Sequence, residues 1–198
     1  MRKIVVGMFV SLDGVMEGPG PADDFALAGW TMPYWDDDVA QFVDAAMGAS
    51  DTLLLGRITY QGFAAAFGAA PADNPEAATM NRFTKYVVST TLEQAEWANS
   101  TVIRENVVEE IARLKEQPGR DITISGSGQV VHTLMRANLI DEYRLLIYPV
   151  ILGQGKRLFP PEVQVPLELV EARTSATGVL LVTYRPAQGP DAVTGEDG

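Results

Sequence analysis

The fold of this chain is indicated most clearly by one stretch, Ile122-Thr123-Ile124-Ser125-Gly126-Ser127-Gly128-Gln129-Val130-Val131. A short β-branched run leads here into two near-adjacent glycines and then into a segment of helical periodicity. Glycine has no Cβ, so such a turn can approach a ligand closely, and the N–H groups that open the next helix attract an anion. The third glycine of the full dinucleotide-binding fingerprint is absent, so the turn either binds a phosphate or only connects a strand to a helix.

Length and composition predict a single cytoplasmic domain. The chain has 198 residues, 46% of them hydrophobic, which is enough for one sizeable core. Its formal net charge of -11 disfavours nucleic acid and anionic membranes as partners. The absence of cysteine excludes thiolate chemistry and cysteine-ligated metals. No apolar run approaches the roughly 20 residues of a membrane span, and the N-terminal run is too short for a signal peptide.

Strand-like and helix-periodic segments alternate along the first two thirds of the chain, which is typical of an α/β fold with helices on a largely parallel sheet. The expected strands are Ile4–Leu12, Thr52–Leu55, Lys85–Ser89, Val102–Ile103 and Ile122–Ser125. Helices are expected behind Asp36-Asp37-Asp38, from Val107 to Leu114, and around Val130 to Leu134.

The last third of the chain has a different character. Tyr143–Leu152 and Gly178–Tyr184 are strand-like with little helix between them, so a mixed, mostly parallel sheet that ends in antiparallel strands is expected. Two segments are expected to be loose, Gly68–Thr79 and the acidic tail 186–198, which leaves residues 1–185 as one domain.

Groups that suit a phosphate follow three of the expected strands. Gly56-Arg57-Ile58-Thr59 places a guanidinium and a hydroxyl where a strand gives way to a helix. Ser89-Thr90-Thr91 offers three hydroxyls, which either cap a turn or contact a phosphate. Ligands of parallel α/β sheets bind beyond the carboxyl ends of strands, so these two turns and the glycine turn predict a dinucleotide site.

Five motifs in order resemble the dihydrofolate reductase-like superfamily. They are Ser11-Leu12-Asp13-Gly14, Leu55-Gly56-Arg57-x-Thr59, Val87-Val88-Ser89-Thr90-Thr91, Ile124-Ser125-Gly126-Ser127-Gly128 and Tyr148-Pro149-Val150-Ile151-Leu152-Gly153-Gln154-Gly155. The first and last are closer to the C-terminal reductase domain of bacterial bifunctional riboflavin-biosynthesis enzymes than to dihydrofolate reductase proper. The resemblance runs from Lys3 to Tyr184. It implies hydride transfer from NADPH to a small heterocycle, its ring-opened sugar adduct, or a ribosylamino-pyrimidine type of substrate, as in 5-amino-6-(5-phosphoribosylamino)uracil reductases. The upstream zinc-deaminase domain of those enzymes has no counterpart, so a stand-alone reductase is expected.

The resemblance implies a cofactor site at the three turns. Arg57 is the expected partner of the 2'-phosphate, and the Ser89 turn is expected beside the adenosine. Ser127 replaces a third consecutive glycine that dihydrofolate reductases usually show, which the backbone tolerates if its φ is negative. The implied cofactor residues are Gly56, Arg57, Thr59, Ser89, Thr90, Thr91, Gly126, Ser127, Gly128 and Gln129.

The substrate side offers several candidates. Asp38 is the nearest counterpart of the carboxylate that holds and helps protonate the pterin in dihydrofolate reductases, although an acidic residue in a first helical turn also stabilises the helix. Asp13 competes for the catalytic role or makes an Asx turn, and Glu17 lies on the same loop. Trp30 and Phe42 either wall a flat heterocycle or belong to the core.

The motifs favour an NADPH-dependent oxidoreductase, with two alternatives left open. They are dihydrofolate reduction proper and a non-catalytic nucleotide-binding module. A homodimer is also expected, because the apolar run from Leu145 to Leu152 implies a strand buried on both faces, by a partner or by the chain's own helices.

Overall fold

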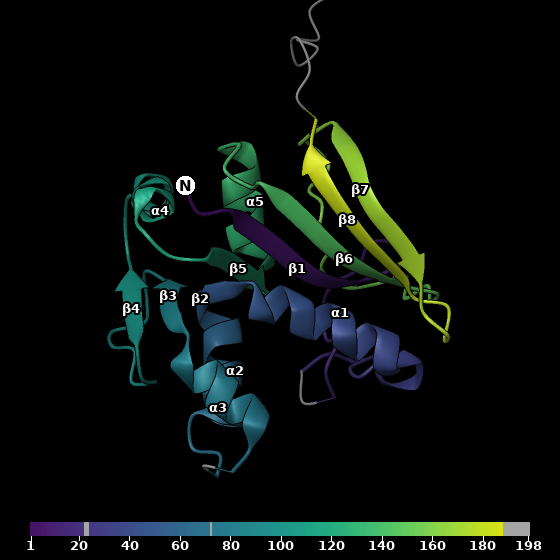
Figure 1. Cartoon of the computed structure of the whole chain (residues 1–198), viewed down its shortest axis with the longest axis horizontal. Coiled ribbons are helices and arrows are strands. Elements are labelled where there is room, and N and C mark those ends of the chain that lie inside the picture. The colour runs from purple at the N-terminus through teal and green to yellow at the C-terminus, as the bar shows by residue number, and fades with distance from the viewer. Residues whose placement is uncertain (22–23, 72, 188–198) are drawn as a thin grey trace, which may run out of the picture.

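A computed structural model describes residues 1–21, 24–71 and 73–187, and an eight-stranded sheet forms its centre (Figure 1). The spatial order of the strands is β4-β3-β2-β5-β1-β6-β8-β7. The strands are β1 (Ile4–Ser11), β2 (Ser50–Gly56), β3 (Thr84–Val88), β4 (Ser100–Ile103), β5 (Asp121–Ser125), β6 (Glu142–Tyr148), β7 (Leu167–Thr174) and β8 (Leu180–Pro186). Strands β1 to β6 pair in parallel, whereas β8 runs antiparallel to β6 and β7 antiparallel to β8. The expected mixed α/β sheet with antiparallel C-terminal strands is therefore confirmed.

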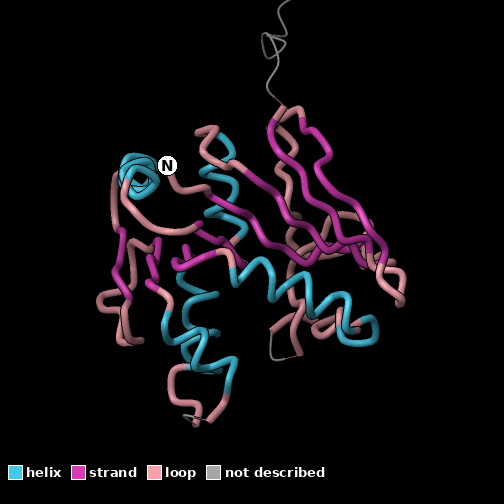
Figure 2. The backbone as a smooth tube through the Cα atoms, in the orientation of Figure 1, coloured by secondary structure: helices cyan, strands magenta, loops and turns pink. Residues whose placement is uncertain are grey.

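Helices cover both faces of the sheet, as the tube in Figure 2 shows. Helices α4 and α5 pack on one face, and α1, α2 and α3 lie on the other. The helices are α1 (Asp37–Gly48), α2 (Arg57–Phe67), α3 (Pro75–Arg82), α4 (Val107–Glu116) and α5 (Gly128–Arg136), with a short 3₁₀ turn at Met32–Tyr34. In the described part of the chain, no helix is long and apolar enough to cross a membrane.

The two faces of the sheet are packed differently. On the α4–α5 face, Ile4, Val6 and Met8 of β1 join one continuous core. On the other face, apolar residues form two separate clusters, one between α1 and the strands β6 and β8, the other between α2–α3 and the strands β2 and β3. The central strands β1 and β5 lie between these clusters, so this face is the one with room for a ligand.

Helix α3 begins inside Gly68–Thr79, the segment that was expected to be loose, so that expectation is wrong for Pro75–Thr79. The Asn74 side chain accepts a hydrogen bond from the backbone N–H of Ala77 at 2.9 Å, and Pro75 occupies the first turn. This is a regular helix start, since the asparagine satisfies a free N–H and proline needs none. The Ala-, Pro- and Asp-rich composition of the segment concealed it.

Strand β6 ends at Tyr148 rather than Leu152, because Pro149 has no N–H for the sheet. It lies between β1 and β8, and both Leu145 and Leu146, which face opposite sides, are buried within one subunit. The apolar run therefore needs no partner chain to explain it. Strand β7 was not expected; it forms the sheet edge and is largely exposed. Pro186 belongs to β8, and residues 188–198 of the predicted tail lie outside the described residues.

Candidate active site

Two helices begin side by side at the carboxyl edge of the sheet. Strands β2 and β5 are neighbours, and they lead directly into α2 and α5. Neither Gly56 nor Ser127, at the two N-cap positions, makes a side-chain capping bond, whereas Asp36 and Asn74 cap α1 and α3. The first-turn N–H groups of α2 and α5 are thus left for other acceptors, and an anion is the acceptor that a helix N-terminus favours.

Hydrogen bonds join the two turns. The backbone N–H of Gly56 donates to Ser127 Oγ at 2.8 Å, and Ser127 Oγ donates to the Ser125 carbonyl at 3.1 Å. Thr59 Oγ1 donates to the Gly126 carbonyl at 3.1 Å. The structure therefore brings Gly56, Thr59, Gly126 and Ser127 together, as expected for one site. Because the Ser127 hydroxyl is buried and already bonded, only its backbone remains for a ligand.

The backbone conformation and the packing at position 126 both require glycine. Its φ is +66°, and an added Cβ would lie 2.9 Å from Thr59 Cγ2. The missing Cβ thus makes room for Thr59 in the turn. Ser127 has a φ of -106°, the negative value that its replacement of glycine requires. Gly128 and the exposed Gln129 open helix α5.

Arg57 and the Ser89 turn flank these helix starts. Arg57 is exposed in the first turn of α2, where its Nη1 donates to Gln61 Oε1 at 3.1 Å. Ser89 is buried, and its Oγ accepts from the backbone N–H groups of Thr91 at 3.2 Å and Leu92 at 2.9 Å. Ser89 therefore caps a turn, which is one of its two expected roles, and leaves the exposed Thr90 and Thr91 at the surface.

A cavity of about 1090 Å³ lies between α1 on one side and α2 and α3 on the other. Its floor comes from the central strands, with Gly7 and Phe9 on β1 and Thr123 and Ser125 on β5. The α1 wall is formed by Ala40, Val43, Asp44 and Met47, and the opposite wall includes Phe63, Phe67, Thr79 and Met80. Ser125 is the last residue before the glycine turn, so the cavity and the paired helix starts adjoin.

Asp38 does not line this cavity. Its Oδ2 accepts a bond from the backbone N–H of Ala176 at 3.3 Å, in the turn between β7 and β8. The carboxylate that α1 does present to the cavity is Asp44, on the same helix face as Ala40 and Met47. Asp38 lies in the first turn of α1, where its carboxylate is bonded to the turn between β7 and β8, whereas Asp44 lies more than one turn further along the helix.

Asp13 and Glu17 connect two loops. Asp13 accepts bonds from Ser11 Oγ at 2.6 Å, Leu152 N at 3.1 Å and Gly153 N at 2.9 Å, and these bonds lower its pKa to about 2. Glu17 accepts a bond from Lys156 N at 3.0 Å and pairs with its Nζ, which lowers the pKa of Glu17. Both carboxylates hold the 150–156 loop to the loop after β1, and neither lines the cavity.

The aromatic candidates divide between cavity and core. Phe42 lines the cavity, as does Trp35, whose ring centroid lies 6.1 Å from that of Phe9. Trp30 is buried elsewhere: its Nε1 donates to the Glu17 carbonyl at 2.8 Å, and its ring packs edge-on against Tyr148 at 5.3 Å.

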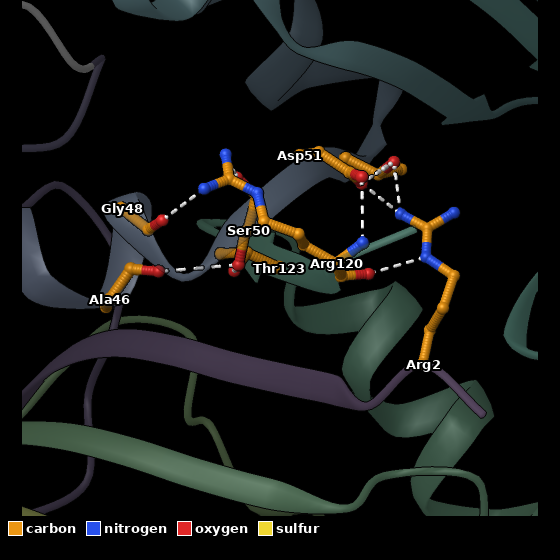
Figure 3. Close-up of polar contacts among 8 residues, drawn as sticks. Arg2, Ala46, Gly48, Ser50, Asp51, Arg120 and Thr123 are labelled. Carbon is orange, nitrogen blue, oxygen red and sulfur yellow. Dashed lines mark hydrogen bonds and ion pairs between the residues drawn. The ribbon is translucent and has the colours of Figure 1, made fainter. Parts of the chain in front are cut away.

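A polar cluster lies at the amino ends of β2 and β5, and most of its residues line the cavity; Figure 3 shows its polar contacts. Arg120 donates from Nη1 to the Gly48 carbonyl at 2.8 Å and from Nη2 to the Ser50 carbonyl at 2.7 Å. It thereby caps the end of α1. Asp51 accepts from the Arg120 backbone N–H at 2.8 Å and pairs with Arg2.

The cavity residues Gly7, Asp44 and Thr123 were not identified from the sequence. A signal existed, since Gly7, Thr123 and Ser125 are small or polar residues in strands that are otherwise strongly apolar. Such residues on central strands indicate that something other than a helix covers them.

A family model, a relative in sequence and solved structures are similar to this chain over most of its length. The RibD C-terminal domain model matches residues 2–181. Protein YyaP of Bacillus subtilis (strain 168), itself uncharacterized, is 32% identical over 92% of this chain and 94% of its own length. A putative riboflavin biosynthesis protein from Shewanella sp. PV-4 has a TM-score of 0.68 at 18% identity, over 94% of this chain and 100% of that chain.

The fold is also that of dihydrofolate reductase. The enzyme from Enterococcus faecalis has a TM-score of 0.59 at 20% identity, over 93% of this chain and 96% of that chain. The family match spans the central sheet, both helix starts and the cavity. This chain belongs to the RibD C-terminal domain family.

Proposed function

We propose that the protein is an NADPH-dependent reductase that transfers a hydride to a small heterocycle or a ribosylamino-pyrimidine type of substrate. Membership of a reductase family supports the oxidoreductase class. The observation that carries the proposal is the junction at Ser125, where two uncapped helix starts adjoin a cavity large enough for a small molecule.

The residues at the carboxyl edge fit a dinucleotide. The backbone N–H groups at the start of α5, with Gly128 and Gln129, would hold the pyrophosphate. Arg57 at the start of α2 would pair with the 2'-phosphate, and Thr90 and Thr91 would lie beside the adenosine. The dihydrofolate reductase of the same fold was solved with NADP(H), which supports a nicotinamide cofactor. Bound NADPH would supply the hydride, while the protein aligns the substrate and excludes water.

The carboxylates divide into different roles. Asp13, with a pKa of about 2, is ionised at neutral pH and so acts as a positioning residue that fixes the loop after β1. Asp38 fixes the β7–β8 turn against α1. Asp44 lines the cavity from α1 and would bind substrate or relay a proton.

A non-catalytic nucleotide-binding module is the second candidate. The observation that favours it is that Asp13 and Asp38, the two carboxylates expected to be catalytic, lie outside the cavity lining. Both candidates bind NADPH, but only a reductase oxidises it.

The test measures NADPH binding by calorimetry and NADPH oxidation at 340 nm with dihydropterins, dihydrofolate, a phosphoribosylaminopyrimidine and simple carbonyls. Oxidation with any of them supports a reductase, and the compound turned over separates dihydrofolate reduction from the rest. Binding without oxidation favours the module, whereas no binding refutes both.

A further inference from the structure

One row of residues crosses the cavity floor on three adjacent strands. Ser125 of β5 pairs with Gly7 of β1, and Gly7 pairs in turn with Arg144 of β6. All three line the cavity. With strands about 4.8 Å apart, Arg144 begins roughly 10 Å from the residue that precedes the glycine turn.

The space above Gly7, the middle residue of this row, is empty of described side chains. An added Cβ at Gly7 would meet only the Ile124 carbonyl oxygen, at 3.9 Å. Two positions further along the same face of β1, Phe9 packs near Trp35, with ring centroids 6.1 Å apart. The floor therefore offers an aromatic surface next to a bare glycine, and a cation beside both.

Arg144 is held through its Nε atom, and among the described residues its two terminal nitrogens remain free to bind a ligand. Its Nε donates to Glu142 Oε1 at 2.7 Å, and its side chain is 20% exposed. In the described part of the chain, neither of its terminal nitrogens has a hydrogen-bond partner. A guanidinium fixed at Nε presents its terminal N–H groups in one plane, which suits an oxyanion.

Glu142 does not neutralise this cation alone. It is 2% exposed and also pairs with Lys3 at 3.5 Å and Arg185 at 3.2 Å, so three cations share one carboxylate. Burial raises the pKa of Glu142, but the Arg144 hydrogen bond and the neighbouring cations lower it further, and Glu142 stays ionised.

The other cavity arginines are less suited to a ligand. Both terminal nitrogens of Arg120 already donate to carbonyl oxygens. Arg82 is exposed at the end of α3. The acidic side chains Asp44 and Glu76 lie on the helical walls, and Asp51 on β2 pairs with Arg2. Among the described strand residues that line the cavity, Arg144 is the cationic one.

We infer that Arg144 binds an anionic group of the substrate, a phosphate or a carboxylate, above Gly7, and that Glu142 is its positioning residue. The inference rests on the proposed function for the identity of the cavity as the substrate site. The substrate class is then a planar ring that packs by Phe9 and Trp35 and carries one oxyanion.

The test compares matched anionic and neutral probes by calorimetry at low ionic strength: ribose 5-phosphate against ribose, and 4-aminobenzoate against 4-aminobenzamide. We expect at least one anion to bind wild type ten-fold or more tighter than its neutral match. Arg144→Met should remove that preference, and Arg144→Lys should keep part of it, because charge remains but the planar fork is lost. If the preference appears with ribose 5-phosphate, the site binds a phosphate; if it appears with 4-aminobenzoate, the site binds a carboxylate.

Arg185→Met is the matched control, since Arg185 pairs with the same Glu142 but does not line the cavity. It should keep the preference. Gly7→Val is an independent variant that leaves both Arg144 and Glu142 in the chain and fills the space above Gly7, where an added Cβ meets only the Ile124 carbonyl oxygen. It should therefore block the anion even if Arg144→Met fails to fold. An equal affinity of wild type for both members of each pair, or an unchanged preference in Arg144→Met or Gly7→Val, would overturn the inference.

NADPH titration of the same variants separates this inference from the proposed function. Arg144→Met should bind NADPH as wild type does. If wild type binds no NADPH but shows the Arg144-dependent preference, the proposed function fails and the anion site stands. If NADPH binds and the preference is absent, the anion site alone fails.

Discussion

The Ser127 hydroxyl accepts a hydrogen bond from the backbone N–H of Gly56 at 2.8 Å and thereby joins the turn after β5 to the turn after β2. These turns are 71 residues apart in sequence. The bond holds two uncapped helix starts in a fixed relation, and each helix start favours an anion.

Ser127→Ala should therefore affect both stability and cofactor binding. It leaves the part-buried Gly56 N–H without its acceptor, which costs about 1–3 kcal/mol of unfolding free energy. NADPH affinity should fall as well, because the two turns are no longer joined. Urea denaturation and calorimetry measure the two effects. Thr133→Ala, which removes another hydroxyl from α5 that bonds only the Gln129 carbonyl, is the control and should change neither. Unchanged stability in Ser127→Ala would contradict the role of this bond.

Arg57→Ala should distinguish the two nicotinamide cofactors. If the guanidinium pairs with the 2'-phosphate, NADPH affinity falls by roughly 1.5–3 kcal/mol and NADH affinity changes little. Arg113→Ala, an exposed arginine on α4, should leave both affinities unchanged. An equal loss for NADPH and NADH would remove Arg57 from this role.

Asp13 should contribute to stability in a defined acid range. Its pKa is lowered from 3.8 to about 2, chiefly by the Ser11 hydroxyl, so the unfolded chain binds its proton first as the pH falls. The contribution is present above about pH 4 and is lost between about pH 4 and pH 2. Asp13→Asn should flatten the pH dependence of the melting temperature in that window, compared with Asp24→Asn at an exposed loop position. The same slope in wild type and Asp13→Asn would show that these bonds do not form.

The expected homodimer needs a different surface from the one that suggested it. Strand β6 is internal, but Leu169 and Val170 on the edge strand β7 are 57% and 47% exposed. We propose that a second copy covers these two side chains, since exposed apolar patches mark interaction surfaces. Light scattering should give about twice the chain mass of 21.4 kDa, and Val170→Lys should return it to the single mass. A wild-type mass of one chain would refute the dimer.

The sequence predicted the sheet and the turns at its carboxyl edge because these depend on local features: β-branched runs, glycines and the order of motifs. It did not predict α3, whose Asn74-Pro75 start lies in a composition typical of loops. The small and polar residues of β1 and β5 were a local signal for the cavity, but its position depends on the gap between two apolar clusters that form only in the folded chain. The choice of Asp44 over Asp38 depends on which part of α1 borders the cavity, and this tertiary relation is not specified by local sequence features.

The central claim is that NADPH binds at the joined helix starts, and amide chemical shifts during an NADPH titration test it most directly. The account predicts the largest shifts at Ile58, Gly128 and Gln129, with smaller ones at Thr90 and Thr91. The start of α4 at Val107, which also lacks a side-chain cap, should not shift and serves as an internal control. An absence of shifts at millimolar NADPH, or shifts centred on α4, would contradict the account.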